Sequence, residues 1–206
     1  MGFLSILSFA HALIRERLRP GELAIDATVG NGVDTLFLCE TVGPKGTVYG
    51  FDVQPQALES ASLRLAARGH GRVGAGGSNA VGAGSGCTKV HLLLRSHAEL
   101  LRAVPEEEHG TAGAVMFNLG YLPGADRAVV TAPASTLPAL AAALTLLRRG
   151  GVATIALYTG HEGGAAEAEA VAAWAAMLPQ SQYRVLQYQF LNQKNAPPYL
   201  IAIEKV

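Results

Sequence analysis

The sequence predicts an α/β fold, in which helices cover a sheet of seven mostly parallel strands that ends in an antiparallel hairpin. Three observations lead to this prediction. Apolar runs alternate with segments of helical periodicity over most of the 206 residues, as in a parallel sheet covered by helices. A turn containing Gly30 and Gly32 joins the first apolar run to the helix after it. The last two apolar runs have no helix between them, so they must pair antiparallel, because a parallel crossover needs about a dozen residues or more.

Composition favours one globular domain over residues 1–206. The chain is long enough for one α/β domain with a core and short for two, half of its residues are apolar, and 16% are charged. Sixteen basic and sixteen acidic side chains give a formal net charge of zero, so charge alone does not indicate nucleic-acid binding, although a local basic patch would be hidden in this total. Cys39 and Cys87 are expected to be ordinary thiols of a reducing compartment. We expect no metal site, because the six histidines and two cysteines form no ligand cluster.

The first twenty residues predict an amphipathic helix. Apolar side chains recur at helical spacing between Phe3 and Leu18, and the segment lacks the basic start and cleavage site of a signal peptide. No segment approaches the roughly twenty apolar residues of a membrane span. We therefore expect a soluble protein of the cytoplasm, with an organelle such as a plastid left open. The helix can cover the sheet edge, cap a substrate cleft or contact a second subunit in a homodimer.

The remaining elements follow in order along the chain. Seven strands are expected at Leu23–Ala27, Thr47–Asp52, Lys89–Leu94, Gly113–Asn118, Val152–Tyr158, Tyr183–Phe190 and Tyr199–Glu204. Helices are expected at Val33–Val42, Pro55–Gly69, from His97, from a cap at Ser135 or Thr136 up to Gly150, and at Ala165–Leu178. Trp174, Met177 and Leu178 are expected in the core. Residues 69–88 are rich in glycine and poor in large apolar side chains, so we interpret them as a flexible insertion.

The turn after the first strand carries a predicted cofactor site. Its candidate binding residues are Asp26, Thr28, Gly30, Asn31, Gly32, Asp34 and Thr35. Glycine lets the backbone turn sharply and approach a ligand, and the following helix offers its positive N-terminus. Asp52 ends the second strand twenty residues beyond Gly32, where a carboxylate can accept hydrogen bonds from ribose hydroxyls, and Gln54 lies beside it. Ser96 and His97 follow the third strand, where they can contact the cofactor or, for Ser96, cap the next helix.

Two ligand classes fit this turn. A nicotinamide dinucleotide usually has the signature G-x-G-x-x-G, but Thr35 stands at the third glycine position. Carboxylates such as Asp26 and Asp34 would repel a pyrophosphate, whereas they suit the cationic amino-acid end of S-adenosylmethionine. A turn without a ligand would explain the glycines but not the acids. An open sheet ending in an antiparallel hairpin is also typical of the Rossmann-like methyltransferase fold, and plain dinucleotide-binding domains usually lack it.

Three polar segments are expected at the same edge of the sheet, where ligands bind in such folds. Asn118 and Tyr121 follow the fourth strand and can orient a nucleophile and stack on a base. Tyr158 and His161 follow the fifth strand, and histidine titrates near neutrality. The loop between the last strands offers amides that can read a base edge, at Asn192, Gln193 and Asn195. Each segment taken alone can also be an ordinary polar turn.

Several of these segments resemble a known family. They are DATVGNGVDT, FDVQ, FNLGYLPG, YTGHEGG and FLNQKNAPPYLIAIEK. The chain resembles, over all but residues 69–88, the rRNA methylase family, whose characterised bacterial and plant members methylate 5-aminomethyl-2-thiouridine at the tRNA wobble position. The resemblance implies S-adenosylmethionine as methyl donor and the tRNA anticodon region as partner. Thr28 differs from the glycine that is common there in methyltransferases generally.

This resemblance leads to a hypothesis of amine N-methylation. The amine must lose a proton before it attacks, and His161 or Asp126 can accept that proton, with Asn118 orienting the nitrogen. His161 is equally consistent with a neutral side chain that only orients the substrate. Methylation of rRNA, methylation of a small molecule, and a nucleotide-binding module without catalysis are the alternatives.

Overall fold

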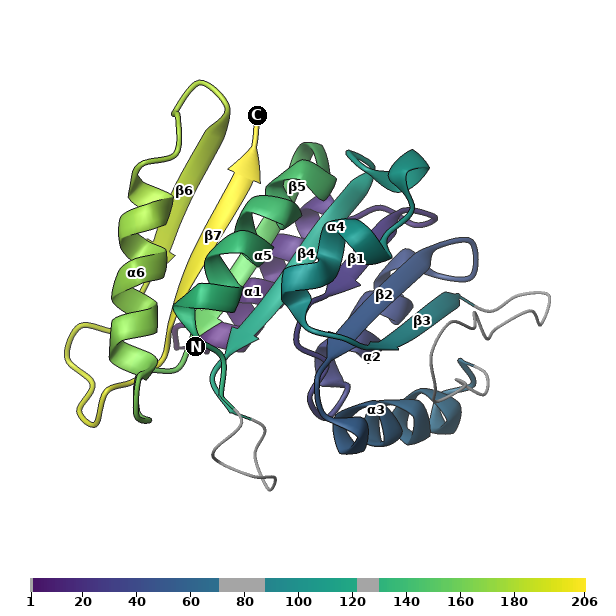
Figure 1. Ribbon diagram of the computed structural model, residues 1–206, viewed down its shortest axis with the longest axis horizontal. Coiled ribbons are helices and arrows are strands. Elements are labelled where there is room, and N and C mark those ends of the chain that lie inside the picture. Colours follow the sequence, from purple (N-terminus) through teal and green to yellow (C-terminus); the bar gives the residue numbers. More distant parts are fainter. Residues whose placement is uncertain (1, 71–87, 122–129) are drawn as a thin grey trace.

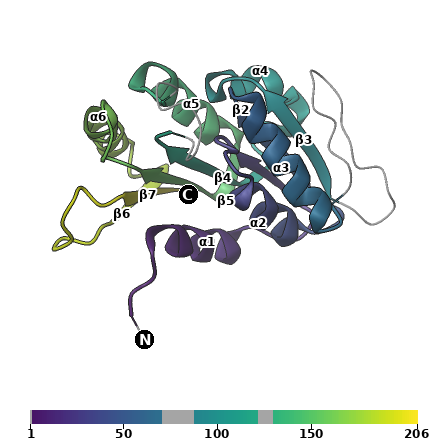
Figure 2. The same ribbon diagram turned by 90° about the horizontal axis from the view of Figure 1, so that it is seen from below.

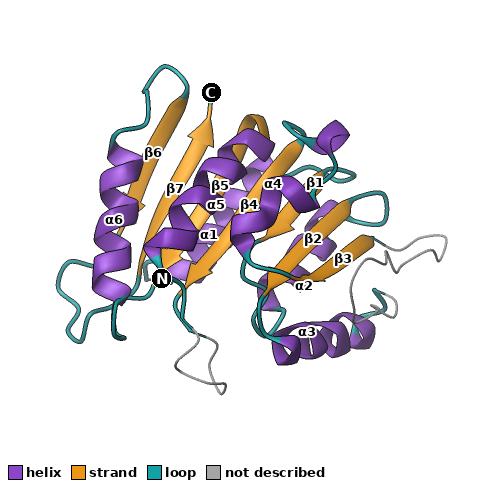
Figure 3. Ribbon diagram, viewed as in Figure 1, coloured by secondary structure: helices purple, strands orange, loops and turns teal. Residues whose placement is uncertain are grey.

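The computed structural model describes residues 2–70, 88–121 and 130–206, and these form one sheet with helices on both faces (Figures 1 and 3). The strand order is β3-β2-β1-β4-β5-β7-β6. The strands are β1 (Leu23–Asp26), β2 (Thr47–Asp52), β3 (Lys89–Leu94), β4 (Ala112–Leu119), β5 (Leu147–Leu157), β6 (Tyr183–Tyr188) and β7 (Tyr199–Lys205). β1 to β5 are parallel, whereas β7 is antiparallel to both β5 and β6. The predicted mostly parallel sheet with an antiparallel C-terminal hairpin is confirmed.

Two helical layers enclose the sheet, as Figure 2 shows. One face carries α1 (Ile6–Arg17), α2 (Val33–Val42) and α3 (Pro55–Ala67), and the other carries α4 (Leu100–Ala103), α5 (Pro133–Leu146) and α6 (Gly164–Ala176). Single 3-10 turns lie at η1 (His97–Glu99) and η2 (Glu106–Glu108). Each layer has its own apolar core. Because strands buried on both faces need apolar residues at successive positions, β1, β4 and β5 appear in the sequence as apolar runs rather than alternating patterns.

The order in which the strands are added to the sheet reverses at β1, which pairs with β2 on one side and β4 on the other. Chain crossovers to the two sides leave a crevice at the carboxyl ends of these strands, the place where open α/β sheets bind ligands. α1 contacts β4, β5 and β7. It runs from this crevice to the opposite edge, where Arg17 hydrogen-bonds Glu204 at 3.3 Å. The N-terminal helix therefore covers a sheet face and begins beside the crevice.

Some local expectations were wrong. α5 begins at Pro133 with Ala132 as its N-cap, because proline suits the first helical position. Ser135 and Thr136 lie inside the first turns, where Ser135 donates to the Ala132 carbonyl and Thr136 donates to Glu167. The helix ends at Leu146 and the chain enters β5 at once, before Gly150. Met177 follows the last residue of α6 and is 77% exposed, whereas Trp174 and Leu178 pack against the core as expected.

Two predictions lie largely or entirely outside the described residues: most of the glycine-rich insertion at 69–88, and Asp126. Across the described ranges, no helix has the length and apolar character needed to cross a membrane.

Candidate active site

A pocket of about 460 Å³ opens at the carboxyl edge, between the loops that follow β1, β2, β3 and β4. Most of the predicted cofactor residues line it, together with side chains from the polar segments that follow β4 and β5. The lining includes Thr28, Gly30, Asn31, Asp34, Asp52, Gln54, Ser96, His97, Asn118, Tyr121 and Tyr158. Segments that the sequence singled out independently thus meet in one cavity.

The turn after β1 is shaped by two glycines with left-handed backbone. Gly30 has φ of +50° and Gly32 has φ of +72°, where residues with a Cβ are strained. A Cβ on Gly32 would lie 2.6 Å from the Ala61 Cα, so this position also permits the close approach of α3. Gly32 caps α2 and does not line the pocket, whereas Gly30 does. The two glycines therefore serve different ends: close packing at Gly32 and access to the cavity at Gly30.

Asp52 joins this turn to the end of β2. Its Oδ2 accepts a hydrogen bond from the Gly30 N–H and its Oδ1 accepts one from the Gln54 N–H, both at 2.9 Å. A carboxylate has about four acceptor positions, so both oxygens retain capacity for ligand hydroxyls. The bonds fix the acid at the pocket wall, in the position that suits a ribose diol.

Asp26 and Thr35 lie behind the pocket rather than in its lining. Both side chains are fully buried, and the Thr35 hydroxyl donates to Asp26 Oδ2 at 2.6 Å while the Thr28 N–H donates to Oδ1 at 3.2 Å. Burial, followed by the negative charge of Asp34, raises the pKa of Asp26 to about 7. In this structure the two residues organise the turn from within the core.

His97 lines the pocket and is itself largely buried. The residue is 8% exposed, and its Nε2 has no hydrogen-bond partner among the described residues. Burial lowers the pKa of the ring, so it is neutral at physiological pH, and a neutral imidazole nitrogen can bind a polar ligand group. Ser96 both lines the pocket and caps η1, since its Oγ accepts the Ala98 N–H at 3.2 Å.

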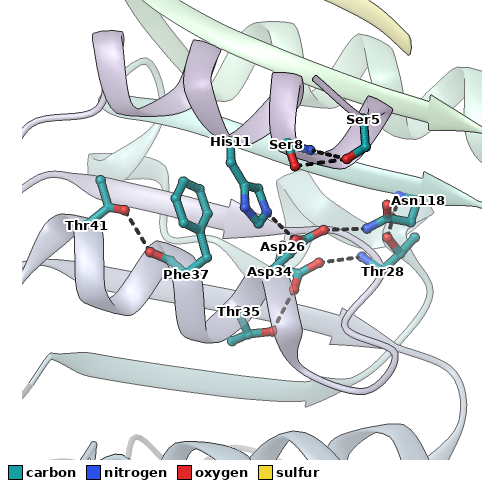
Figure 4. Close-up of polar contacts among 10 residues, drawn as sticks. All are labelled: Ser5, Ser8, His11, Asp26, Thr28, Asp34, Thr35, Phe37, Thr41 and Asn118. Atoms are coloured by element: carbon teal, nitrogen blue, oxygen red, sulfur yellow. Dashed lines mark hydrogen bonds and ion pairs between the residues drawn. The ribbon is translucent and has the colours of Figure 1, made fainter. Parts of the chain in front are cut away.

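Asn118 is held by the turn after β1 and by the first turn of α2 (Figure 4). Its backbone N–H donates to Thr28 Oγ1 and its side-chain Nδ2 donates to Asp34 Oδ2, each at 2.7 Å. Thr28 thus ties the first strand's turn to the end of β4. The threonine that departs from the common methyltransferase glycine has a structural task here.

His11 reaches the same cluster from α1, which the sequence did not predict. Its Nε2 lies 2.6 Å from Asp34 Oδ1, and its ring stacks on Phe37 at 3.8 Å between centroids (Figure 4). Leu7, also on α1, lines the pocket. In the sequence, His11 is a single histidine one residue after Ala10 in an otherwise apolar helix stripe. That position gives no indication of a partner 23 residues further along the chain.

The two tyrosines predicted to contact the substrate lie at the pocket mouth. Tyr121 and Tyr158 line the pocket and are 39% and 36% exposed. Burial, with the charge of Asp34, raises the pKa of Tyr158, so its hydroxyl remains protonated near neutral pH. His161 packs edge-on to Tyr121 and against Gly164 at the start of α6, outside the pocket lining. Both its ring nitrogens are buried and lack partners among the described residues, so its role as proton acceptor stays a prediction.

The loop between β6 and β7 lies at the same edge but outside the pocket. Asn192, Gln193 and Asn195 are exposed, and the loop is tied to the Tyr158 segment by a hydrogen bond from the Thr159 hydroxyl to the Ala196 carbonyl at 3.2 Å. Its amides are accessible to a large ligand that covers the pocket mouth. Within the described residues, no three His, Cys, Asp or Glu side chains gather closely enough to hold a metal ion.

Comparison with known proteins identifies the family. The family described as "Putative rRNA methylase" matches residues 48–204. The chain belongs to this family. A chloroplastic tRNA (mnm5s2U34)-methyltransferase from Arabidopsis thaliana is 37% identical over 91% of this chain. A small-subunit rRNA methyltransferase H from Syntrophotalea carbinolica is 28% identical over 50% of it. The chain spans 65% and 27% of the lengths of these two proteins.

Solved structures agree with this assignment over the whole chain. A Streptococcus mutans protein in complex with S-adenosylhomocysteine (SAH) has a TM-score of 0.82 and 35% identity, with all of both chains covered. An rRNA methylase from Streptococcus thermophilus has a TM-score of 0.76 and 30% identity, with 100% of this chain and 99% of that one covered. The predicted methyltransferase fold and family are confirmed.

Proposed function

We propose that this protein is an S-adenosylmethionine-dependent methyltransferase that acts on the aminomethyl nitrogen of 5-aminomethyl-2-thiouridine at the tRNA wobble position. One observation carries the proposal: a single pocket joins the glycine-and-acid turn of Gly30 and Asp52 to the acceptor-side residues Asn118, Tyr121 and Tyr158. Donor and acceptor sites must adjoin for direct methyl transfer. The plant tRNA methyltransferase supports the choice of substrate.

The pocket fits the donor on chemical grounds. Asp52 is fixed where it can accept ribose hydroxyls, and the unpartnered Nε2 of His97 offers a polar contact to the nucleoside end. Asp34, 5% exposed at the pocket wall, supplies negative charge that suits a cationic amino-acid end. When bound, S-adenosylmethionine supplies a methyl group already activated by the sulfonium sulfur.

The protein itself must align the amine nitrogen with the methyl group and favour the loss of a proton from the amine. Holding the amine nitrogen in line with the transferred methyl replaces an improbable encounter by a fixed geometry. An amine with a pKa near that of lysine costs roughly 4–5 kcal/mol to neutralise at pH 7. A pocket lined largely by apolar surface favours the neutral amine, and Asn118 can accept a hydrogen bond from it. His161 and Asp126 are retained as proposed proton acceptors.

The same edge of the sheet offers side chains that suit the proposed RNA partner. Tyr121 and Tyr158 can stack on an exposed base, and the amides of Asn192, Gln193 and Asn195 can contact the surrounding anticodon loop. These contacts, the tRNA itself and a homodimer belong to the proposal.

Transfer of a labelled methyl group tests the substrate directly. The protein is incubated with methyl-labelled S-adenosylmethionine and one of three RNAs: tRNA carrying 5-aminomethyl-2-thiouridine, the same tRNA without the modification, and rRNA. We expect label only in the first, recovered as the 5-methylaminomethyl nucleoside after digestion. The variant Asn118→Ala is expected to lower kcat by about 100-fold, because it removes an orienting group next to the reacting nitrogen.

One control variant and two contrary results complete the experiment. Glu59→Gln changes an exposed side chain of α3 and should leave the rate unchanged. Label in rRNA but not in the aminomethyl tRNA would refute the tRNA substrate and favour rRNA, in line with the family's description. No transfer to any RNA would remove the proposed RNA methyltransferase activity altogether.

A further inference from the structure

We propose that His11 is a positioning residue for methyl transfer: through Asp34 it fixes the Asn118 amide with its oxygen facing the incoming amine. The inference rests on the proposed function for the identity of that amine. It concerns α1, which lies before the family-matched region of residues 48–204. The N-terminal helix, which covers one face of the sheet, thereby also becomes part of the active site.

The chain of contacts starts at a well-held histidine. The His11 side chain is 19% exposed, stacks on Phe37 with an interplanar angle of 6°, and places Nε2 2.6 Å from Asp34 Oδ1. The Asp34 side chain is 6% exposed. An acid in such surroundings needs hydrogen-bond donors, and His11 and Asn118 supply one to each of its oxygens.

The chemistry of Asp34 determines the orientation of Asn118. An ionised carboxylate can only accept hydrogen bonds, so the amide must present its NH₂ group to Asp34. The carbonyl oxygen Oδ1 then lies on the other branch of the amide and remains the acceptor of this pocket-lining residue. An amide flipped the other way would place two acceptors together and present a donor to the amine, which offers its own N–H groups.

His11 matters because Asp34 has few other restraints in this cluster. If the histidine bond is lost, the carboxylate can rotate and the amide loses its fixed partner. The expected consequence is misalignment of the amine rather than loss of substrate affinity, and small misplacements reduce rates strongly.

Kinetics of three variants test the proposal. His11→Leu removes the donor, His11→Gln keeps a side-chain NH₂ that can reach Asp34 without a titratable ring, and His91→Gln is the matched control. His91 lies on β3, where it stacks on Tyr49 outside the pocket. With aminomethyl tRNA we expect His11→Leu to lower kcat by about 10- to 100-fold, with KM for tRNA and Kd for SAH changed by less than about threefold. His11→Gln should recover most of kcat, and His91→Gln should match the wild type.

A second readout does not depend on turnover. Labelling with ¹⁵N-asparagine gives five side-chain amide pairs, from Asn31, Asn79, Asn118, Asn192 and Asn195. The variant Asn118→Ala assigns the pair of interest. We expect one slowly exchanging, shifted Asn118 Nδ2 proton in the wild type and in His11→Gln, and its loss in His11→Leu.

Each contrary result overturns the inference. Wild-type kcat and unchanged amide signals in His11→Leu would show that His11 positions nothing. Equal inactivity of His11→Gln and His11→Leu, with the Gln variant's amide signal intact, would assign a proton-transfer role instead. A raised Kd for SAH with unchanged kcat would place its effect on the donor. Absence of methyl transfer by the wild type would refute the proposed function, whereas the amide signals would still decide whether His11 holds Asn118.

Discussion

At the scale of single residues, burial and neighbouring charge decide what Asp26 contributes. The side chain is fully buried, and desolvation with the charge of Asp34 raises its pKa to about 7 from an ordinary value near 3.8. The folded protein therefore retains a proton between about pH 4 and pH 7 that the unfolded chain has released. Because the folded state binds more protons in this range, the free energy of unfolding falls as pH rises through it.

Asp26→Asn tests this consequence. The amide can accept the Thr28 N–H and donate to the Thr35 hydroxyl, so both hydrogen bonds survive without an ionisable group. Urea unfolding at pH 5, 6, 7 and 8 should show the variant gaining stability relative to the wild type as pH rises, by on the order of 2–3 kcal/mol between pH 5 and pH 8. Glu59→Gln, on the exposed side of α3, should follow the wild-type pH dependence. A constant difference between Asp26→Asn and wild type would contradict the raised pKa.

At the scale of elements, the turn after β1 can pack against α3 only because Gly32 has no side chain. Gly32 and Gly163 are both N-caps in the left-handed region, at φ of +72° and +79°. A Cβ on Gly32 would meet the Ala61 backbone at 2.6 Å, whereas a Cβ on Gly163 would meet nothing within 4 Å. The two positions share the conformational cost and differ in the steric one.

Alanine at each position separates these two effects. Gly163→Ala should lower the free energy of unfolding by about 1–2 kcal/mol through backbone strain alone. Gly32→Ala should lower it by a further 1–3 kcal/mol, the usual cost of overpacking, and should weaken SAH binding because the turn moves. Denaturant unfolding and calorimetric titration measure both. Equal destabilisation by the two substitutions would mean that α3 moves away freely.

At the scale of the whole molecule, a ligand that binds only the folded protein raises its melting temperature. At 100 times its Kd, SAH should add about 2.7 kcal/mol of stability, which for a domain of this size corresponds to a rise of roughly 5–11 °C. NAD⁺ at the same concentration should produce no rise, because carboxylates beside the turn disfavour a pyrophosphate. A thermal scan with each ligand compares them. Stabilisation by NAD⁺ and not by SAH would reverse the assignment of the donor site.

The sequence predicted the parts of this protein that depend on neighbours along the chain. Strand positions, the antiparallel ending and the glycine turn follow from periodicity and from turn chemistry, which are local properties. The fold could therefore be predicted almost completely, with errors at the ends of elements, such as the start of α5 after Ala132 and the start of β5 at Leu147 instead of Val152. Helix ends depend on one or two competing caps, and Pro133 prevailed over Ser135 as the start of α5.

The tertiary structure decided which polar residues share the pocket. Asp26 and Thr35 looked equivalent to Thr28 and Asn31 in the sequence, yet both are buried. Asp26 ends β1, which is buried along its whole length, and Thr35 lies among the buried residues of α2. The amides at Asn192, Gln193 and Asn195 reach the right edge but lie outside the cavity. His11 joins Asp34 across 23 residues because α1 packs on β4, β5 and β7 with its first turn beside the pocket, which Leu7 lines. Spacing in a sequence determines which face of an element a residue occupies, whereas only packing determines what that face meets.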